Sequence, residues 1–445
     1  MTTTRRAVLR TAALATAMLA IPFVRGSHAS GKLSVAFWDH WVPGANKPLE
    51  QLCREWAEKE KVDLTVDFIT SNGDKDLLTA AAEAQARTGH DMMQLTAWYA
   101  PGHAASLEPV DDVMERLIGQ NGAVSEGAAY LGKQDGRWIA VPTSFGSTVS
   151  PPCARIDLMK QLTGLDVTKM YPAEAPPDKE LRDQWTWDFF TQAAEKCARG
   201  GHPFGMPLST CSDAVQWVGA MFNSYGAQLV DAEGRITVNN DATRTVLEWF
   251  KRTAPHFPES VYAWDDASNN KALISGHSAL IFNAPSAWAV ARRDQPKIAE
   301  QLWTFPPPKG PQGRHVSGRY RYWGIWNFSP NKAAAKSLLL HLSGKDAVEK
   351  LVAASQGFDI PPFEGMADFK VWDEAAPPRG TLYNFPPRGD VVVSVAGHPA
   401  PARIGVQMYA QGIMCKTIAQ CTQQGRSIDE AISFCERELE GYMRT

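Results

Sequence analysis

The sequence lacks the features of a membrane-spanning protein or a metal protein. Beyond the N-terminal segment, no run of 18 uncharged apolar residues occurs, so we expect no transmembrane helix in the mature chain. The seven cysteines include no Cys-x-x-Cys pair and no Cys/His spacing typical of a zinc site. We therefore expect neither a bound metal nor a cofactor.

Sequence motifs of catalysis are also missing. H-E-x-x-H and G-x-G-x-x-G do not occur. Residues 127–133 read G-x-x-x-x-G-K, but Gln134 stands where a phosphate-binding loop needs Ser or Thr for magnesium. Gly276 begins a partial nucleophile elbow, and Leu280 replaces its second glycine. The residues give no positive case for catalysis, so we expect a protein that is not an enzyme.

Neither positive nor negative residues dominate the sequence, since the 445 residues carry a formal net charge of −3. The first 29 residues place Arg5 and Arg6 before an apolar segment, and they end in the small-x-small pattern Ser27-His28-Ala29. This resembles a twin-arginine (Tat) signal peptide, the alternative being a basic N-terminus that stays attached. Its removal takes away four arginines and changes the net charge to −7. A mildly acidic exported protein is a poor candidate for binding nucleic acid or anionic membranes, and we expect it in the periplasm.

The cysteines number seven, so at least one must stay free or pair between chains. Export permits disulfides. We expect Cys197 and Cys211 to pair and most of the others to be small buried apolar groups.

Strand and helix patterns alternate at the start of the mature chain. Residues 32–38, 62–68 and 91–95 read as strands, and the helix between the first two places Leu49, Leu52, Cys53 and Trp56 on one face. This order predicts right-handed crossovers and a mostly parallel sheet, the α/β class. The length allows two or three domains.

Aromatic residues gather where these strands end. Trp38–Trp41 follows the first strand and Trp98-Tyr99 follows the third, while a Ser71–Gly73 turn follows the second. Ligands of open α/β sheets collect beyond the carboxyl ends of strands. A single tryptophan more often packs in a core, but aromatics at two strand ends together indicate a binding site.

The stretch 270–288 reads as a helix end, a stop at Gly276, a strand at 278–282 and a turn at 283–286. We interpret it as a place where the chain crosses between two lobes. A helix–strand connection inside one domain is the alternative.

Several later elements have clear local signals. Thr186 predicts the start of a helix, and Ser427 and Glu430 form the capping box of a last helix. Helices are also expected at about 214–224 and 242–253. Residues 167–184 have no apolar period and predict an exposed loop.

The ordered set of motifs resembles a known family. The segments that carry the resemblance are FWDHW at 37–41, DMMQL at 91–95, GRWIAVP at 136–142, TWD at 186–188, DAEG at 231–234, VNN at 238–240, the stretch 270–288, FPP at 305–307 and PQGR at 311–314. The chain is similar to the extracellular solute-binding proteins of carbohydrate ABC importers, the maltose-binding-protein-like group, over residues 32–442.

The resemblance implies a two-lobe periplasmic-binding-protein fold (type II), with mostly parallel sheets and crossing hinge strands. It implies an N-terminal lobe of residues 30–144 plus 284–342 and a C-terminal lobe of residues 145–283 plus 343–445. Crossings are expected near Ser144–Gly146, Phe282–Ser286 and His341–Lys345, with hinge residues Ser144, Phe145, Gly146, Asn283 and Ala284. The implied function is delivery of a sugar or sugar derivative to the membrane permease subunits of an ABC importer, by a monomer that closes on its ligand.

The residue types and their positions predict which residues contact the ligand. Aromatic planes suit the apolar faces of a sugar, and carboxylates, amides and guanidinium groups suit its hydroxyls. The expected ligand-binding residues are Trp38, Asp39, His40, Trp41, Asn72, Trp98, Tyr99, Phe145, Trp217, Trp264, Asn283, Arg319, Tyr320, Trp323 and Gln356. For Trp217 and Trp323, packing in the core is the alternative that the residues favour.

Other ligands and one other function remain open at this point. Residues 147–154 depart from the family pattern, so no sugar specificity can be transferred. Arg319 and Arg321 leave an anionic ligand open, and the same fold could bind a polyol, a glycerophosphodiester or another small polar solute. An exported glycan hydrolase or lyase is the alternative from another class.

Overall fold

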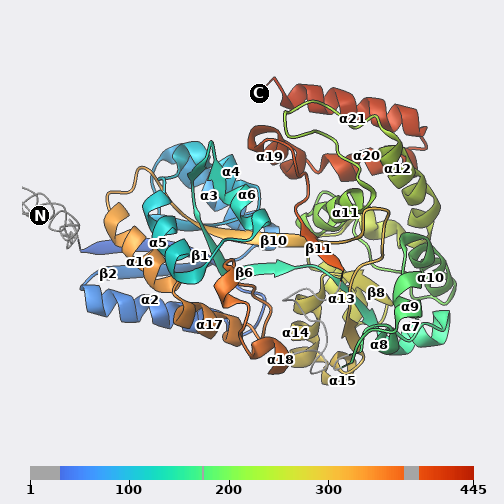
Figure 1. The fold of residues 1–445 in the computed structure, drawn as a ribbon, viewed down its shortest axis with the longest axis horizontal. Helices are drawn as coiled ribbons and strands as arrows, with labels where there is room; N and C mark the ends of the chain where they lie inside the picture. Colours follow the sequence, from blue (N-terminus) through green and yellow to red (C-terminus); the bar gives the residue numbers. More distant parts are fainter. Residues whose placement is uncertain (1–30, 173–174, 375–389, 445) are drawn as a thin grey trace, which may run out of the picture.

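The computed structural model describes residues 31–172, 175–374 and 390–444. The expected signal peptide, residues 1–29, lies outside these ranges. The described chain forms two halves that lie side by side and are joined by long strands (Figure 1). The mixed α/β architecture agrees with the two-lobe fold expected from the sequence.

The first half is built on the predicted parallel strands β1 (Lys32–Trp38), β2 (Asp63–Ile69) and β3 (Met92–Thr96). They belong to a sheet of order β11-β10-β3-β1-β2. Helices α2 (Asn46–Glu60) and α3 (Lys75–Ala86) make the crossovers between them. The carboxyl ends of all three strands therefore meet at one edge of the sheet, as the alternating pattern predicts.

Helix α2 covers this sheet with the predicted apolar face. Leu49, Leu52, Cys53 and Trp56 are all buried. Two later helices, α16 (Lys332–Leu342) and α17 (Lys345–Ala354), pack against the same helix. The crossing expected at His341–Lys345 is therefore wrong, because the chain stays in the first half through α17.

Two long strands join the halves. β6 (Val141–Val149) and β10 (Arg314–Ile325) run antiparallel in the middle of the molecule (Figure 1). Their pairing is interrupted between Thr143 and Thr148, where β6 bulges opposite Arg319–Arg321. The expected hinge segment Ser144–Gly146 lies in this bulge.

The second half contains a small antiparallel sheet. β7 (Pro152–Arg155) pairs on one side with β8 (Leu280–Phe282) and on the other with β9 (Leu302–Thr304). The chain leaves β8, forms α14 (Ala284–Asp294) and returns to the same sheet. The crossing expected at Phe282–Ser286 is thus wrong, and what reads as a turn from Asn283 is the start of a helix. The strand that crosses back is β10.

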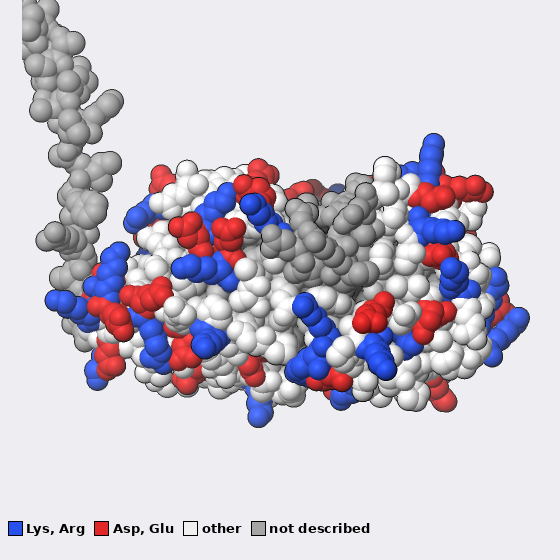
Figure 2. All heavy atoms as spheres, turned by 90° about the horizontal axis from the view of Figure 1, so that it is seen from below, with Lys and Arg blue, Asp and Glu red and all other residues white. Residues whose placement is uncertain are grey.

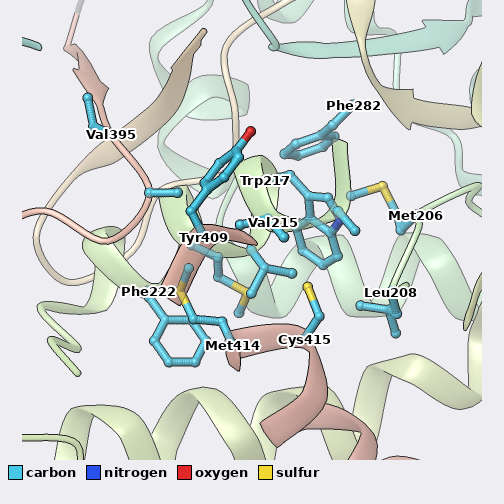
Figure 3. Packing of buried hydrophobic residues seen from close by; sticks show 14 of the residues in the cluster. Met206, Leu208, Val215, Trp217, Phe222, Phe282, Val395, Tyr409, Met414 and Cys415 are labelled. Carbon is cyan, nitrogen blue, oxygen red and sulfur yellow. The ribbon is translucent and has the colours of Figure 1, made fainter. Parts of the chain in front are cut away.

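Helices cover the small sheet and form a core rich in aromatic rings. Helices α10 (Trp187–Arg199), α11 (Ser212–Tyr225) and α12 (Asp241–Thr253) lie where the sequence predicts them, and Thr186 caps α10 as expected. Trp187 packs near Trp217, Trp249 and Phe282. In Figure 3, Trp217 lies among Phe282, Met206 and Leu208, inside this core.

The remaining elements are shorter or lie at the ends of the chain. The other strands are β4 (Lys133–Gln134), β5 (Arg137–Trp138) and β11 (Val391–Ser394). The other α-helices are α4 (Tyr99–Gly102), α5 (Asp111–Asn121), α6 (Glu126–Gly132), α7 (Ile156–Thr163), α8 (Val167–Met170), α9 (Lys179–Gln184), α13 (Ser268–Ile274), α15 (Pro296–Ala299), α18 (Val371–Glu374), α19 (Ala402–Ala410), α20 (Ile413–Thr422) and α21 (Ile428–Tyr442). Short 3-10 turns occur at Asn72–Asp74, Ala104–Ser106, Ala254–His256, Glu259–Ala263 and Glu364–Met366.

Local sequence signals predicted the start of the last helix correctly, but they did not predict two short helices. The capping box of Ser427 and Glu430 opens α21 as predicted. The expected loop at 167–184 contains α8 and α9, whose first turns Asp166 and Asp178 cap. The expected Cys197–Cys211 disulfide is not present, since both thiols are free.

A substitution of Gly146 would show how tightly the joining strands pack. Its φ is +81°, and a Cβ added there would lie 2.6 Å from Arg321 Cδ and 2.7 Å from Trp38 Cε3. Gly164 has a similar φ of +79°, and a Cβ there meets no atom within 4 Å. We expect Gly164→Ala to lower the free energy of unfolding by about 1 kcal/mol through backbone strain alone. Gly146→Ala should lower it by a further 1–3 kcal/mol, roughly, through overpacking. Urea denaturation measures both, and equal losses would contradict the packing described here.

Candidate functional site

A cavity of about 800 Å³ lies between the two halves. Its walls come from the strand ends of the first half, from α11, α13 and α19 of the second half and from β10, which contributes Arg319 and Arg321. A volume of this size is typical of small-molecule sites. The cavity is therefore the candidate site.

The first-half wall is made where the sequence predicts it. Trp41 follows β1, Asn72 and Asp74 follow β2, and Tyr99 follows β3. Trp41 and Tyr99 are half-buried, so each keeps a free part of its ring. Loops that follow three neighbouring parallel strands thus meet at one edge of the sheet.

The second-half wall supplies two more aromatic rings and a row of hydroxyls. Trp264 is half-buried, and its Nε1 donates to Ser260 Oγ at 2.9 Å. Tyr409 of α19 is buried and accepts a hydrogen bond from Gln216 Nε2 at 3.0 Å. Its ring meets Tyr99 of the first half edge-on, with 6.4 Å between the centroids. The hydroxyl-bearing residues Ser209, Thr210 and Ser212 lie beside them.

Arg319 enters the cavity from β10 already paired with a carboxylate. Its Nη2 donates to Asp213 Oδ1, and Asn269 Nδ2 donates to Asp213 Oδ2 at 2.9 Å. Burial opposes the charge of Arg319, but Asp213 and Asp266 raise its pKa above the ordinary value. The Asp213 carboxylate, 1% exposed, compensates this cation.

Arg321 lies two residues further along β10, on the same face of the strand. Its guanidinium carbon is 3.9 Å from the centroid of the Trp38 ring, a cation–π contact. The ion pair with Asp76 is long, 3.8 Å from Nη1 to Oδ2. Burial lowers the pKa of Arg321 to about 10, so the group is charged at neutral pH.

The sequence matches one family over most of its length. The profile of the bacterial extracellular solute-binding proteins matches residues 52–378. This chain is an extracellular solute-binding protein. No curated protein sequence matches it. In the part of the chain that the structure describes, this binding protein has no helix long and apolar enough to cross a membrane and no cluster of side chains suited to a metal ion.

Solved structures of low sequence identity share the fold of the binding protein. Maltose-bound MalE3 of T. maritima is 19% identical over 92% of this chain and 99% of that chain, with a TM-score of 0.69. The GacH receptor of Streptomyces glaucescens, solved unliganded and with acarbose, is 17% identical over 92% and 98%, with a TM-score of 0.67. A sugar transporter protein from Arthrobacter chlorophenolicus A6 with bound laminaribiose is 13% identical over 92% and 99%, with a TM-score of 0.71.

Five of the residues expected to bind ligand line the cavity of the binding protein. They are Trp41, Asn72, Tyr99, Trp264 and Arg319. Three come from the first half, one from the second and one from the joining strand β10. Their role in binding stays a prediction, but the fold brings them to one place.

Three expected contacts near the end of β1 lie beneath the cavity. Trp38 is buried under Arg321, and its Nε1 donates to Ser71 Oγ at 3.1 Å. His40 Nδ1 accepts a hydrogen bond from the Val42 amide, so its Nε2 carries the proton donated to Asp359 Oδ1 at 2.9 Å. Phe145 is fully buried with its ring edge-on to His40. These side chains support the site and do not line it.

Four expected aromatic contacts pack in interiors. Trp98 donates to the carbonyl of Ala396 at 2.8 Å and lies against Gly405 of α19, so it joins the halves. Trp217 lies in the second-half core (Figure 3). Tyr320 points away from the arginines, toward Gly127 on α6, because alternate residues of a strand face opposite sides. Trp323 is edge-on to Phe37 in the first-half core.

Three polar residues also lie off the cavity. Asp39 is exposed and accepts from Asn46 Nδ2 at 2.7 Å. Gln356, which follows the end of α17, accepts from Arg292 Nη1 of α14 at 2.8 Å. Asn283 is buried and donates to Asn269 Oδ1 at 3.4 Å, behind Asp213. Asn283 is therefore connected to the cavity through Asn269 and Asp213.

Sequence reasoning missed several cavity residues. Tyr409 lies on a C-terminal helix with no motif that signals a ligand site. Asp76 and Lys271 sit on helices whose patterns look like ordinary solvated faces. Arg321 was named from the sequence only as part of a basic pair, although its spacing of two from Arg319 on a strand places both on one face.

The Asp213–Arg319 pair gives a stability test for the binding protein. Asp213→Asn leaves the buried Arg319 guanidinium without its carboxylate, which should lower the free energy of unfolding by about 3–5 kcal/mol. Asp188→Asn is the matched control, because its pair with Arg252 is exposed on both sides and long, at 3.3 Å. We expect a loss of at most about 1 kcal/mol there. Chemical denaturation of both variants measures the difference, and a small loss for Asp213→Asn would contradict a compensated cation at this position.

Proposed function

We propose that this protein binds a sugar or a closely related polyhydroxylated solute in the cavity and delivers it unchanged to the permease subunits of an ABC importer. The observation that carries the proposal is the pairing of aromatic rings across the cavity. Trp41 and Tyr99 come from the first half, and Trp264 and Tyr409 from the second. Rings on two sides suit the two apolar faces of a pyranose, and the polar groups between them suit its hydroxyl rim.

Closure of the two halves is the proposed mechanism. Polar contacts strengthen when water leaves a site, so the closed form binds best. The proposed first lobe contains residues up to 144 and the later segment through α18, and the proposed second lobe contains residues 150–313 and 395–444. β6 and β10 are the proposed crossings. The β6 bulge at Ser144–Gly146 is the proposed hinge.

The family and the ligands of structural neighbours support a place outside the cytoplasm. We propose the periplasm, a Tat-type signal at residues 1–29 and a monomeric receptor without catalytic activity. The bound neighbours carry maltose, acarbose and laminaribiose. Those ligands are sugars, which makes a carbohydrate the first class to test before polyols and glycerophosphodiesters.

A ligand panel tests binding without turnover. A sugar present at 100 times its dissociation constant should stabilise the protein by about 2.7 kcal/mol, seen as a rise in Tm. The same solute should be recovered unchanged after long incubation, which a hydrolase or lyase would not allow. No shift with any sugar, polyol or phosphodiester would overturn the proposal, and product formation would favour the glycan-active enzyme.

Cys211 can show where the solute binds. It lines the cavity and is half-buried, while the other six cysteines are buried. Burial raises the pKa of its thiol, so labelling by a maleimide should be slow. A solute that fills the cavity at 100 times its dissociation constant should slow labelling by up to about 100-fold. Cys211→Ser should abolish the labelled fraction, and unchanged labelling with a stabilising ligand would place that ligand elsewhere.

A further inference from the structure

Arg321 is buried in the floor of the cavity, and neither its charge nor its hydrogen-bond donors are fully matched by neighbouring groups. The residue is 6% exposed and stacked over Trp38, whose ring is fixed by Ser71. Among the described residues, its Nε and Nη1 donors have no hydrogen-bond acceptor, and both atoms are fully buried. The Asp76 carboxylate stands 3.8 Å from Nη1, beyond hydrogen-bonding distance. A buried cation with unused donors is costly unless something that enters the cavity satisfies it.

The other charged groups of the cavity already have partners or solvent. Arg319 is compensated by Asp213, as described above. Asp266 accepts from Ser212 Oγ at 2.7 Å and from the Asp213 amide at 2.9 Å. Asp265 accepts from Ser268 Oγ at 2.5 Å. Asp74 and Lys271 are exposed at the rim, where water solvates them.

Arg319 Nε also lacks an acceptor, but Arg319 has a contacting carboxylate, so a weakly compensated charge and unused donors coincide at Arg321. A guanidinium group presents its N–H donors in a planar fork that fits the oxygens of a carboxylate or a phosphate. A neutral hydroxyl would accept a hydrogen bond from the guanidinium group of Arg321 without compensating its positive charge. The stacked Trp38 ring holds the guanidinium plane, so the fork is oriented before a ligand arrives.

We propose that the solute carries an oxyanion, a carboxylate or a phosphate on a polyhydroxylated frame, and that Arg321 binds it. This inference rests on the proposed function, because it assigns the ligand class of the same cavity. Arg321 selects the charged group, and the aromatic rings of both halves contact the frame.

Asp76 sets the strength of this selection. Its carboxylate forms the long ion pair with Arg321, and burial raises the pKa of Asp76 above the ordinary value, although Arg321 opposes the shift. When charged, it repels an incoming anion. Asp76→Asn should remove that repulsion and leave the shape of the side chain unchanged. An anionic ligand should then bind roughly tenfold more tightly. A neutral sugar that used Asp76 as a hydroxyl acceptor would bind more weakly instead.

The test compares ligands that share a frame and differ in charge. Isothermal titration would use glucose, glucuronate, glucose 6-phosphate and glucosamine, with the galactose and mannose counterparts, and glycerol with glycerol 3-phosphate. We expect one anionic member to bind at least 30-fold more tightly than its neutral parent, and the carboxylate and phosphate forms identify the oxyanion. Preference for a neutral sugar or for an amino sugar overturns the inference and leaves the proposed function standing. Binding of none overturns both.

Variants separate the role of Arg321 from a role in folding. Arg321→Gln should reduce affinity for the anionic ligand at least 30-fold and remove the preference over its neutral parent. Arg293→Gln, at an exposed pair with Asp294 on α14, is the matched control and should change neither. If Arg321→Gln does not fold, Asp76→Asn decides the matter, because tighter anion binding supports the inference and weaker or equal binding overturns it.

Discussion

The strand β10 constrains the whole molecule, because it belongs to both halves at once. Its first residues pair with β11, its middle pairs with β6, and its end pairs with β3 at the edge of the parallel strands. Period-two alternation sends Arg319 and Arg321 to the cavity and Tyr320 and Tyr322 to α6. The floor of the site is therefore fixed by backbone hydrogen bonds, and only the walls belong to one half or the other.

Buried charge then explains why so many polar side chains lie behind the site. A guanidinium group in an apolar surrounding needs a carboxylate, and that carboxylate needs its own donors. Asp213 accepts a hydrogen bond from Asn269, and Asn269 accepts one from Asn283. Three hydrogen-bonded side chains thus connect the start of α14 to the cavity. On the other side, Trp38 and Ser71 fix the plane of Arg321. The surface shown in Figure 2 differs in kind, since acidic and basic side chains alternate over that face and solvent screens them.

The sequence predicts the parts of this arrangement that depend on local pattern. The β1-α2-β2-α3-β3 order places Trp41, Asn72 and Tyr99 at one sheet edge, and capping residues fix the starts of α10 and α21. Local pattern cannot show which strand a three-residue segment pairs with. For that reason β8 was expected to leave the second half, although it pairs with β7. The same holds for α17, whose apolar face fits either half until its packing on α2 is known.

Aromatic residues were the least predictable, because an indole ring satisfies a core and a ligand equally well. Trp98 and Trp217 fill interiors, while Trp41 and Trp264 keep free ring surface. Tertiary contacts distinguish the buried rings from the cavity-lining ones. Trp98, for example, faces Gly405, where any larger residue would collide with its ring.

The two arginines also couple the halves to each other. The partner of Arg319, Asp213, belongs to α11 in the second half, and the partners of Arg321, Trp38 and Asp76, belong to the first. Because both arginines stand on one strand, a solute that contacts them is held by groups from both sides of the cavity. Contacts of that kind form fully only when the walls approach, so binding energy favours the closed arrangement over the open one. The bulge of β6 beside Arg321 is the proposed hinge, because the irregular pairing there is confined to β6 and leaves the pairing of β10 with β3 intact.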